Sequence, residues 1–79
     1  MCKIGDVVFA VVKNNSTFHL ETTRAEVTRI TETSIFLERP ESKLVTLVWE
    51  FPKKEWNNSI FYEQDKAQEA LEKRVKSGR

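Results

Sequence analysis

The sequence predicts a mostly β protein that ends in a single α-helix. Short apolar stretches with a two-residue alternation, separated by polar turns, fill residues 4–62. From Glu63 onward the chain is a run of strong helix formers without Gly or Pro before Gly78. A chain of 79 residues has room for one domain. We therefore expect a single domain over residues 1–79, with a strand-rich body at 4–62 and a helix at about 64–76.

The first part of the body predicts one long strand and a polar hairpin turn. Residues 7–12 are β-branched and nearly all apolar, which is typical of a strand that is buried on at least part of both faces. Lys13 ends this strand, and residues 14–17 have the side chains that favour turns. We expect residues 18–20 to form a short extended piece and residues 21–23 to be a polar connection.

The second strand is expected at residues 24–31, and its pattern contains an irregularity. Ala25 and Val27 share one face of the strand, but the next apolar residue, Ile30, is out of phase with them. A phase slip of one residue indicates a β-bulge or a sharp bend. Bent strands are typical of small sheets that curl into a barrel. Residues 32–33 then form a tight turn.

The rest of the body predicts two strands, a charged loop and a short final strand. Residues 34–38 form a third strand closed by Arg39 and Pro40, because proline cannot donate to a strand ladder. The clearest alternation follows, and it predicts a core-facing row before Pro52 stops the strand. Together these elements predict a small SH3-like, partly open barrel of about four or five strands. The core-facing row is Val45, Leu47, Trp49 and Phe51; the charged loop is 53–58; the final strand is 59–62.

The C-terminal helix has one narrow apolar stripe. Its members are spaced i, i+3, i+4 and i+8, which predicts a helix that lies close against the sheet or plugs one end of the barrel. Glu69 and Lys73 are also spaced for an ion pair on the solvent side. The apolar stripe consists of Ala67, Ala70, Leu71 and Val75.

Three segments of the chain carry a resemblance to a known group of proteins. The stretches 5–8 and 25–33, and 60–62 leading into Ala67-x-x-Ala70-Leu71, resemble the small, mostly uncharacterised proteins of bacteriophages and prophages in Gram-positive bacteria. Those proteins have a similar length and a strand-rich body followed by a helix. The resemblance implies a phage- or prophage-encoded binding protein that modulates or inhibits a bacterial host protein, including a defence system. It brings no catalytic residues, and it implies action in the host cytoplasm.

The residues themselves offer little for catalysis. The single histidine, His19, and the single cysteine, Cys2, cannot form a zinc cluster. Gly5 and Gly78 are the only glycines, so a phosphate-cradling loop is not expected. Glu26 and Glu38 are candidates to face each other across neighbouring strands, which is more typical of a solvated sheet face than of an acid–base pair. We expect no enzyme activity, no cofactor and no metal.

Net charge and hydropathy limit which partners and which cellular location are expected. The chain has 13 basic and 12 acidic residues, a net charge of +1, whereas a nucleic-acid-binding protein usually has a clear basic excess. No apolar run approaches the roughly 20 residues that cross a bilayer, and the N-terminus lacks the apolar stretch of a signal peptide. The sequence thus predicts a cytoplasmic protein that makes no use of a membrane.

The candidate partner-binding site is an aromatic and basic loop. Trp56 follows Lys53 and Lys54, and we expect Phe18 and Tyr62 nearby if the strands close a barrel. Loops and exposed aromatic side chains are where small barrels bind partners. The sequence leaves open whether Trp56 is an exposed anchor or folds back as a lid on the barrel mouth.

Two alternative functions remain open at this point. In the first, the barrel binds nucleic acid, with Trp56 stacking on a base and basic side chains on the phosphates. In the second, copies of the chain assemble through sheet edges that so small a body leaves unpaired. The basic side chains for the first alternative are Lys53, Lys54, Arg74, Lys76 and Arg79.

Overall fold

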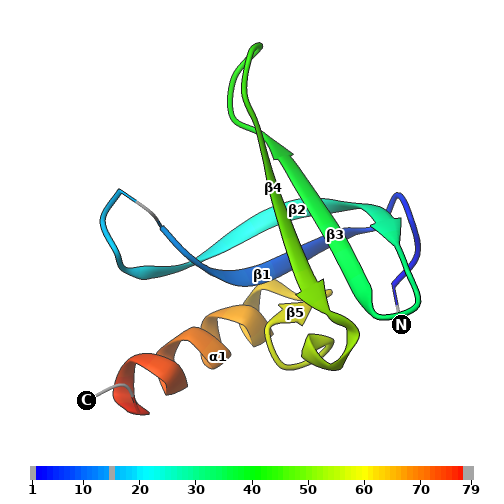
Figure 1. The fold of residues 1–79 in the computed structure, drawn as a ribbon. Coiled ribbons are helices and arrows are strands. Elements are labelled where there is room, and N and C mark those ends of the chain that lie inside the picture. Colours follow the sequence, from blue (N-terminus) through cyan, green and yellow to red (C-terminus); the bar gives the residue numbers. More distant parts are fainter. Residues whose placement is uncertain (1, 15, 78–79) are drawn as a thin grey trace.

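The fold is an antiparallel sheet of five strands with one C-terminal α-helix (Figure 1). The structure is a computed structural model and describes residues 2–14 and 16–77. The strand order is β4-β3-β2-β1-β5, so the predicted fold class, mostly β with one C-terminal helix, is confirmed and is compatible with a small, partly open barrel. The elements are β1 Val7–Lys13, β2 Leu20–Ile30, β3 Ser34–Pro40, β4 Thr46–Pro52, the 3₁₀ helix η1 Lys53–Glu55, β5 Ile60–Phe61 and α1 Gln64–Ser77.

Strand β2 begins earlier than the sequence predicted. It starts at Leu20, so the expected polar connection at 21–23 is wrong. The carboxamide oxygen of Asn14 accepts the backbone N–H groups of Ser16 and Thr17 and closes a compact turn. Phe18 then adopts a positive φ of 61° instead of the expected extended conformation. Pairing with the apolar strand β1 therefore resumes as soon as this turn ends.

The predicted irregularity in the second strand is a β-bulge. The register of β2 against β3 shifts between Val27 and Arg29, which leaves Thr28 as the extra residue. Its hydroxyl donates to Glu38 at 2.8 Å. Because of the bulge, Ile30 packs against the same core as Val27 despite its different phase. In Figure 1 the long strand β2 runs alongside β1 and then carries the chain into the β3–β4 hairpin, which crosses over them.

The main core lies on one face of the curled sheet. It is built from small and medium aliphatic side chains, which suits the thin interior of a domain of this size. Ile30, Trp49, Phe51 and Trp56 pack against it while they remain partly exposed. The buried members are Cys2, Val8, Ala10, Val12, Ala25, Val27, Ile35, Leu37 and Ile60.

Strand β4 contributes less to this core than its alternation predicted. Leu47, Trp49 and Phe51 face the core but are only half-buried. Val45 precedes the strand and is 49% exposed, so its predicted burial is wrong. The reason is topological, because β4 ends the strand order and has β3 as its one neighbour in the sheet.

The open edge of β4 can be assigned residue by residue. Lys53 N–H donates to Thr33 C=O at 2.9 Å, and Val45 C=O accepts from Glu41 N–H at 2.9 Å. Odd-numbered residues of β4 therefore point their backbone groups toward β3, and even-numbered residues point theirs to the open side. Pro52 is even-numbered, so its missing N–H removes nothing from the β3 ladder, and the strand includes it.

Helix α1 covers the other face of β1 and β2. Val11 alternates with the core residues Ala10 and Val12 but is buried as well, as predicted for a strand covered on both faces. Ala67 on the helix is fully buried. The helix therefore lies against the outside of the sheet and does not plug a barrel end (Figure 1). In residues 2–14 and 16–77, no helix has the length and apolar character needed to cross a membrane.

Only part of the predicted apolar stripe of the helix packs against the sheet. Ala67, Ala70 and Leu71 lose exposure against the sheet, but Val75 remains 60% exposed, so its predicted docking is wrong. Figure 1 shows the C-terminal turns of α1 diverging from the strands. On the solvent side, Lys73 Nζ lies 3.4 Å from Glu69 Oε1, which confirms that predicted pair.

Candidate functional site

The indole of Trp56 packs back onto the fold and is not fully exposed. It follows η1 directly, is half-buried and packs against the main core. Its ring also meets Tyr62 edge to face, with ring centroids 4.9 Å apart and an interplanar angle of 82°. Such edge-to-face pairs are favourable beyond the area that they bury. Part of the indole is thus committed to the fold, and the remainder shares a surface with Tyr62.

Tyr62 is held by a polar latch at the start of β1. Its hydroxyl donates to Asp6 Oδ2 at 2.7 Å, and the backbone N–H of Lys3 donates to the same oxygen at 2.8 Å. The Lys3 bond first, and the Tyr62 bond second, lower the pKa of the Asp6 carboxyl. Conversely, the hydrogen bond to Asp6 is the main reason that the pKa of Tyr62 rises to about 12. The latch joins the end of β5 to the segment before β1.

This latch is directly testable because Tyr62 is the only tyrosine. We expect the ultraviolet phenolate signal to titrate with a pKa of about 12 and to move toward about 10 in Asp6→Asn. Because the folded-state pKa of Tyr62 is raised, the latch contributes stability below about pH 10 and loses it as pH rises through about 12. The pKa of Asp6 is lowered in the folded state, so the stability that its ionised carboxylate contributes is lost as the pH falls through this lowered pKa.

The control for the latch is Lys3→Gln, which keeps the backbone N–H that binds Asp6. Its tyrosine titration is expected to stay close to that of the wild type. An Asp6→Asn protein whose phenolate signal titrates at the wild-type pH would show that the hydroxyl does not bind Asp6 in solution.

The remaining predicted site residues are spread over the molecule. Lys53 and Lys54 form η1 with Glu55, just before Trp56, and Lys54 is the more exposed of the two lysines. Phe18 lies at the tip of the β1–β2 hairpin, beyond the opposite end of β1 from the latch. The structure therefore brings Trp56 and Tyr62 together and separates Phe18 from them.

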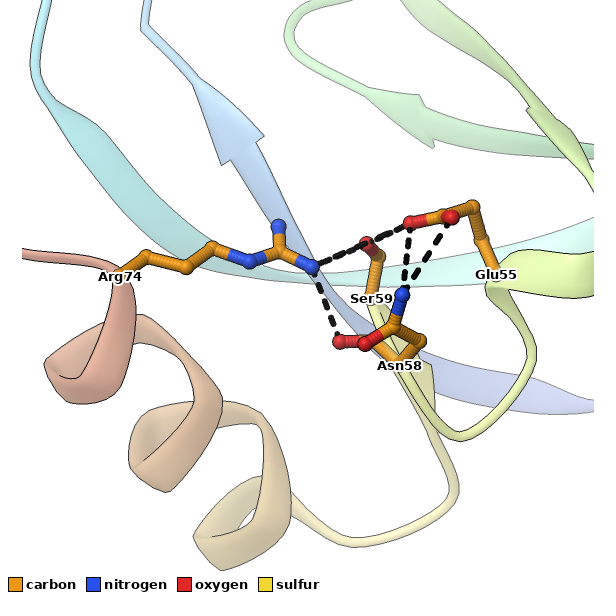
Figure 2. A network of polar contacts seen from close by, with 4 residues as sticks. All are labelled: Glu55, Asn58, Ser59 and Arg74. Atoms are coloured by element: carbon orange, nitrogen blue, oxygen red, sulfur yellow. Dashed lines mark hydrogen bonds and ion pairs between the residues drawn. The ribbon is translucent and has the colours of Figure 1, made fainter. Parts of the chain in front are cut away.

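Arg74 joins the helix to the turn that follows η1 (Figure 2). Its Nη2 donates to the backbone oxygen of Asn58 at 3.0 Å and to the buried hydroxyl of Ser59 at 2.6 Å. The Ser59 hydroxyl donates in turn to Glu55, whose Oε1 lies 3.9 Å from the guanidinium. This cation is engaged inside the molecule, whereas the nucleic-acid alternative required it to bind phosphate.

A cleft that the sequence analysis did not anticipate lies between the two hairpins. The β1–β2 hairpin and the β3–β4 hairpin diverge beyond the core (Figure 1). Val12, Leu47 and Trp49 give the cleft an apolar lining. Polar side chains also line the cleft, namely Lys13, Asn14, Ser16, Glu21, Arg39 and Glu41.

The carboxylates around the cleft already have partners. Arg39 binds Glu41 through Nη2 at 3.0 Å and also donates through Nη1 to the Thr23 hydroxyl at 2.8 Å. Asn14 donates to Glu21 at 3.3 Å. Lys13 lies over the Phe18 ring, 5.7 Å from its centroid, and forms no ion pair within the described ranges 2–14 and 16–77. The cleft thus combines an apolar lining with one cation that is free to meet an acidic partner.

The sequence contained a weak signal for this cleft. Leu47 and Trp49 were recognised by alternation, but the pattern of one strand does not reveal that the strand lies at a sheet edge. Arg39 continues the core-facing phase of Ile35 and Leu37 on β3. A charged residue in that phase marks the place where the apolar core ends and the cleft begins.

The lining of the cleft mixes polar and apolar side chains. No group of three or more His, Cys, Asp or Glu side chains suited to a metal ion occurs among residues 2–14 and 16–77. Several of these polar groups bind one another, Glu41 to Arg39 and Glu21 to Asn14, beside the apolar side chains. No protein-family model, curated protein or solved structure matches the chain.

Proposed function

We propose that this chain is a non-enzymatic binding module that takes a partner protein between its two hairpins. The observation that carries the proposal is the cleft itself, with a half-buried tryptophan, Trp49, in its lining. Each hairpin also presents a large apolar side chain at its tip, Phe18 with 73% exposure and Leu44 with 95%. Large exposed apolar groups around a concave surface are typical of protein-interaction sites.

The charges around the cleft favour a protein over a nucleic acid. Both signs are present, and Arg39 is already paired with Glu41. A phosphate backbone is bound mainly by unpaired Lys and Arg, which would give a strongly salt-dependent affinity. A surface that mixes apolar side chains with polar groups of both signs is instead compatible with a protein–protein interface.

The proposed class of partner comes from the resemblance described above. The segments 5–8, 25–33 and 60–71 resemble phage and prophage proteins, and we propose a bacterial host protein as the partner. Binding would modulate or inhibit that protein in the host cytoplasm. Occupation of a surface is sufficient for inhibition, so this role requires no catalytic group on the chain.

The proposal is tested with matched surface variants. Tagged wild-type protein, the double variant Phe18→Ser/Leu44→Ser and the control Val75→Ser are used to capture partners from bacterial lysate, with and without nuclease. All three substituted side chains are exposed, so each variant is expected to fold. The double variant should lose a protein that the wild type and Val75→Ser retain, because only the double variant alters the hairpin tips.

Two results would contradict the proposal. Capture that is equal for all three proteins would show that the partner does not use the hairpins. Capture that disappears after nuclease treatment would show that a nucleic acid is the direct ligand. The purified captured protein is then titrated against the variants, and loss of a hot-spot side chain should cost about 2 kcal/mol or more of binding free energy.

A further inference from the structure

We infer that the cleft binds its partner as an extended segment, which adds a strand to the open edge of β4. This inference rests on the proposed function, because it specifies how the same cleft would hold a protein. It names an occupant of defined chemistry, a peptide in β conformation with apolar side chains at alternate positions and an acidic residue at one end.

The backbone of β4 is arranged to accept such a strand. Thr46, Val48 and Glu50 point their N–H and C=O groups away from β3, to the open side. The strand is 7 residues long, and in the part of the chain that the structure describes its ladder is formed with β3. Main-chain hydrogen bonds of this kind provide affinity in strand addition, and side-chain pockets provide specificity.

The two ends of the sheet differ in how well their edges are protected. Strand β5 has 2 residues, and α1 lies next to it. Strand β4 is longer, and it has no lysine and no bulge in its pairing with β3. Its proline, Pro52, stands at the last position. Short length, lysines, bulges and prolines are the usual protections of an exposed edge, so β4 is an edge that remains open to pairing.

The space beside β4 suits one strand better than a second copy of the chain. In Figure 1 the β1–β2 hairpin crosses β4 and extends past it on the side away from β3. Val12 from this hairpin lines the cleft together with Leu47 and Trp49. A single added strand would rest on this hairpin. A second copy paired through its own β4 about a two-fold axis would have to bring a second β1–β2 hairpin to the same side of the sheet.

Charge and pattern define the segment further. Side chains of an added strand alternate between the cleft and the solvent, so those that face Val12, Leu47 and Trp49 should be apolar. The acidic groups around the cleft are already bonded, Glu41 to Arg39 and Glu21 to Asn14. Lys13 is the cation that remains for a ligand, which favours an acidic residue at the end of the segment that reaches the β1–β2 tip.

The test uses two pools of synthetic peptides of about nine residues, slightly longer than β4. Both pools have the same composition of Val, Ile and Phe with one terminal Asp. One pool places the apolar residues at alternate positions, and the other places them at i, i+3 and i+4. Titration followed by tryptophan fluorescence should show binding of the alternating pool and at least about tenfold weaker binding of the helical pool.

Backbone variants of peptide and protein supply the decisive comparison. N-methyl groups are introduced into the peptide one residue at a time. Binding should be abolished at every second position and kept at the positions between, since alternate N–H groups face β4. Val48→Pro removes an N–H that points to the open edge, and it should weaken binding about tenfold, whereas Val48→Thr keeps that N–H and should not. Lys13→Glu should reverse the preference from a terminal Asp to a terminal Lys.

Each other outcome overturns the inference. The effects of Val48→Pro and of the double variant Phe18→Ser/Leu44→Ser together show whether the proposed function fails with it. If Val48→Pro does not weaken peptide binding but Phe18→Ser/Leu44→Ser weakens capture of the partner protein, the cleft binds a protein in another way. If neither change matters, the proposed function fails too. Preference for the helical pool, N-methyl effects without a two-residue period, or no binding of either pool would exclude strand addition. A concentration-dependent dimer lost in Val48→Pro would make a second copy the occupant.

Discussion

Replacing Leu37 by Ala is expected to lower the free energy of unfolding by about 2–5 kcal/mol. Leu37 has 0% exposure, and it lies on β3, which is paired on both sides, between Val27 of β2 and Trp49 of β4. The truncation removes contacts with both neighbouring strands and leaves a cavity. At roughly 0.05–0.15 kcal/mol per residue, a domain of this size has only about 4–12 kcal/mol of stability in total.

Denaturant unfolding followed by tryptophan fluorescence measures this loss. The matched control is Val45→Ala, because Val45 belongs to the row that the sequence predicted to face the core but is 49% exposed. Its expected effect is within about 0.5 kcal/mol. A Leu37→Ala protein that unfolds at the same denaturant concentration as Val45→Ala would show that the core does not centre on β3.

The second large effect is expected at the helix–sheet contact. Ala67→Asp places a carboxylate at a fully buried position of α1. An uncompensated buried charge costs about 3–5 kcal/mol, and the helix has to leave the sheet to avoid that cost. We expect a lower midpoint of thermal unfolding together with weaker helical circular dichroism.

Gln68→Asp is the matched control, since it introduces the same charge at the next, exposed position of the same helix turn. It should change the free energy of unfolding by less than about 0.5 kcal/mol. Similar losses for the two variants would mean that the helix is destabilised by aspartate itself and that docking of Ala67 contributes little.

The fold class could be predicted from sequence because its signals are local. Alternation and turn residues mark the strands, and the phase slip at Ile30 revealed the bulge. The start of β2 at Leu20 was missed because pairing with β1 stabilises Glu21–Thr23 as a strand, although these residues look like a loop on their own. Local preference yields to tertiary pairing in such segments.

The candidate site was less accessible to sequence reasoning. The half-burial of Trp49 follows from the position of β4 at the end of the strand order, and the half-burial of Trp56 follows from its packing on the core and on Tyr62. Both depend on which segments of the chain become neighbours in the fold, and a single sequence does not reveal this. The cleft likewise depends on residues from all four long strands or the turns beside them.

The bulge at Thr28 also has a geometric consequence for the cleft. Strand β2 pairs with both β1 and β3, so its bend determines the angle between the two hairpins. Deletion of the extra residue would restore an even pleat and rotate the β3–β4 hairpin relative to β1 and β2, while each hairpin kept its own pairing. A residue outside the cleft, Thr28, therefore contributes to the angle at which the cleft opens between Val12 and Trp49.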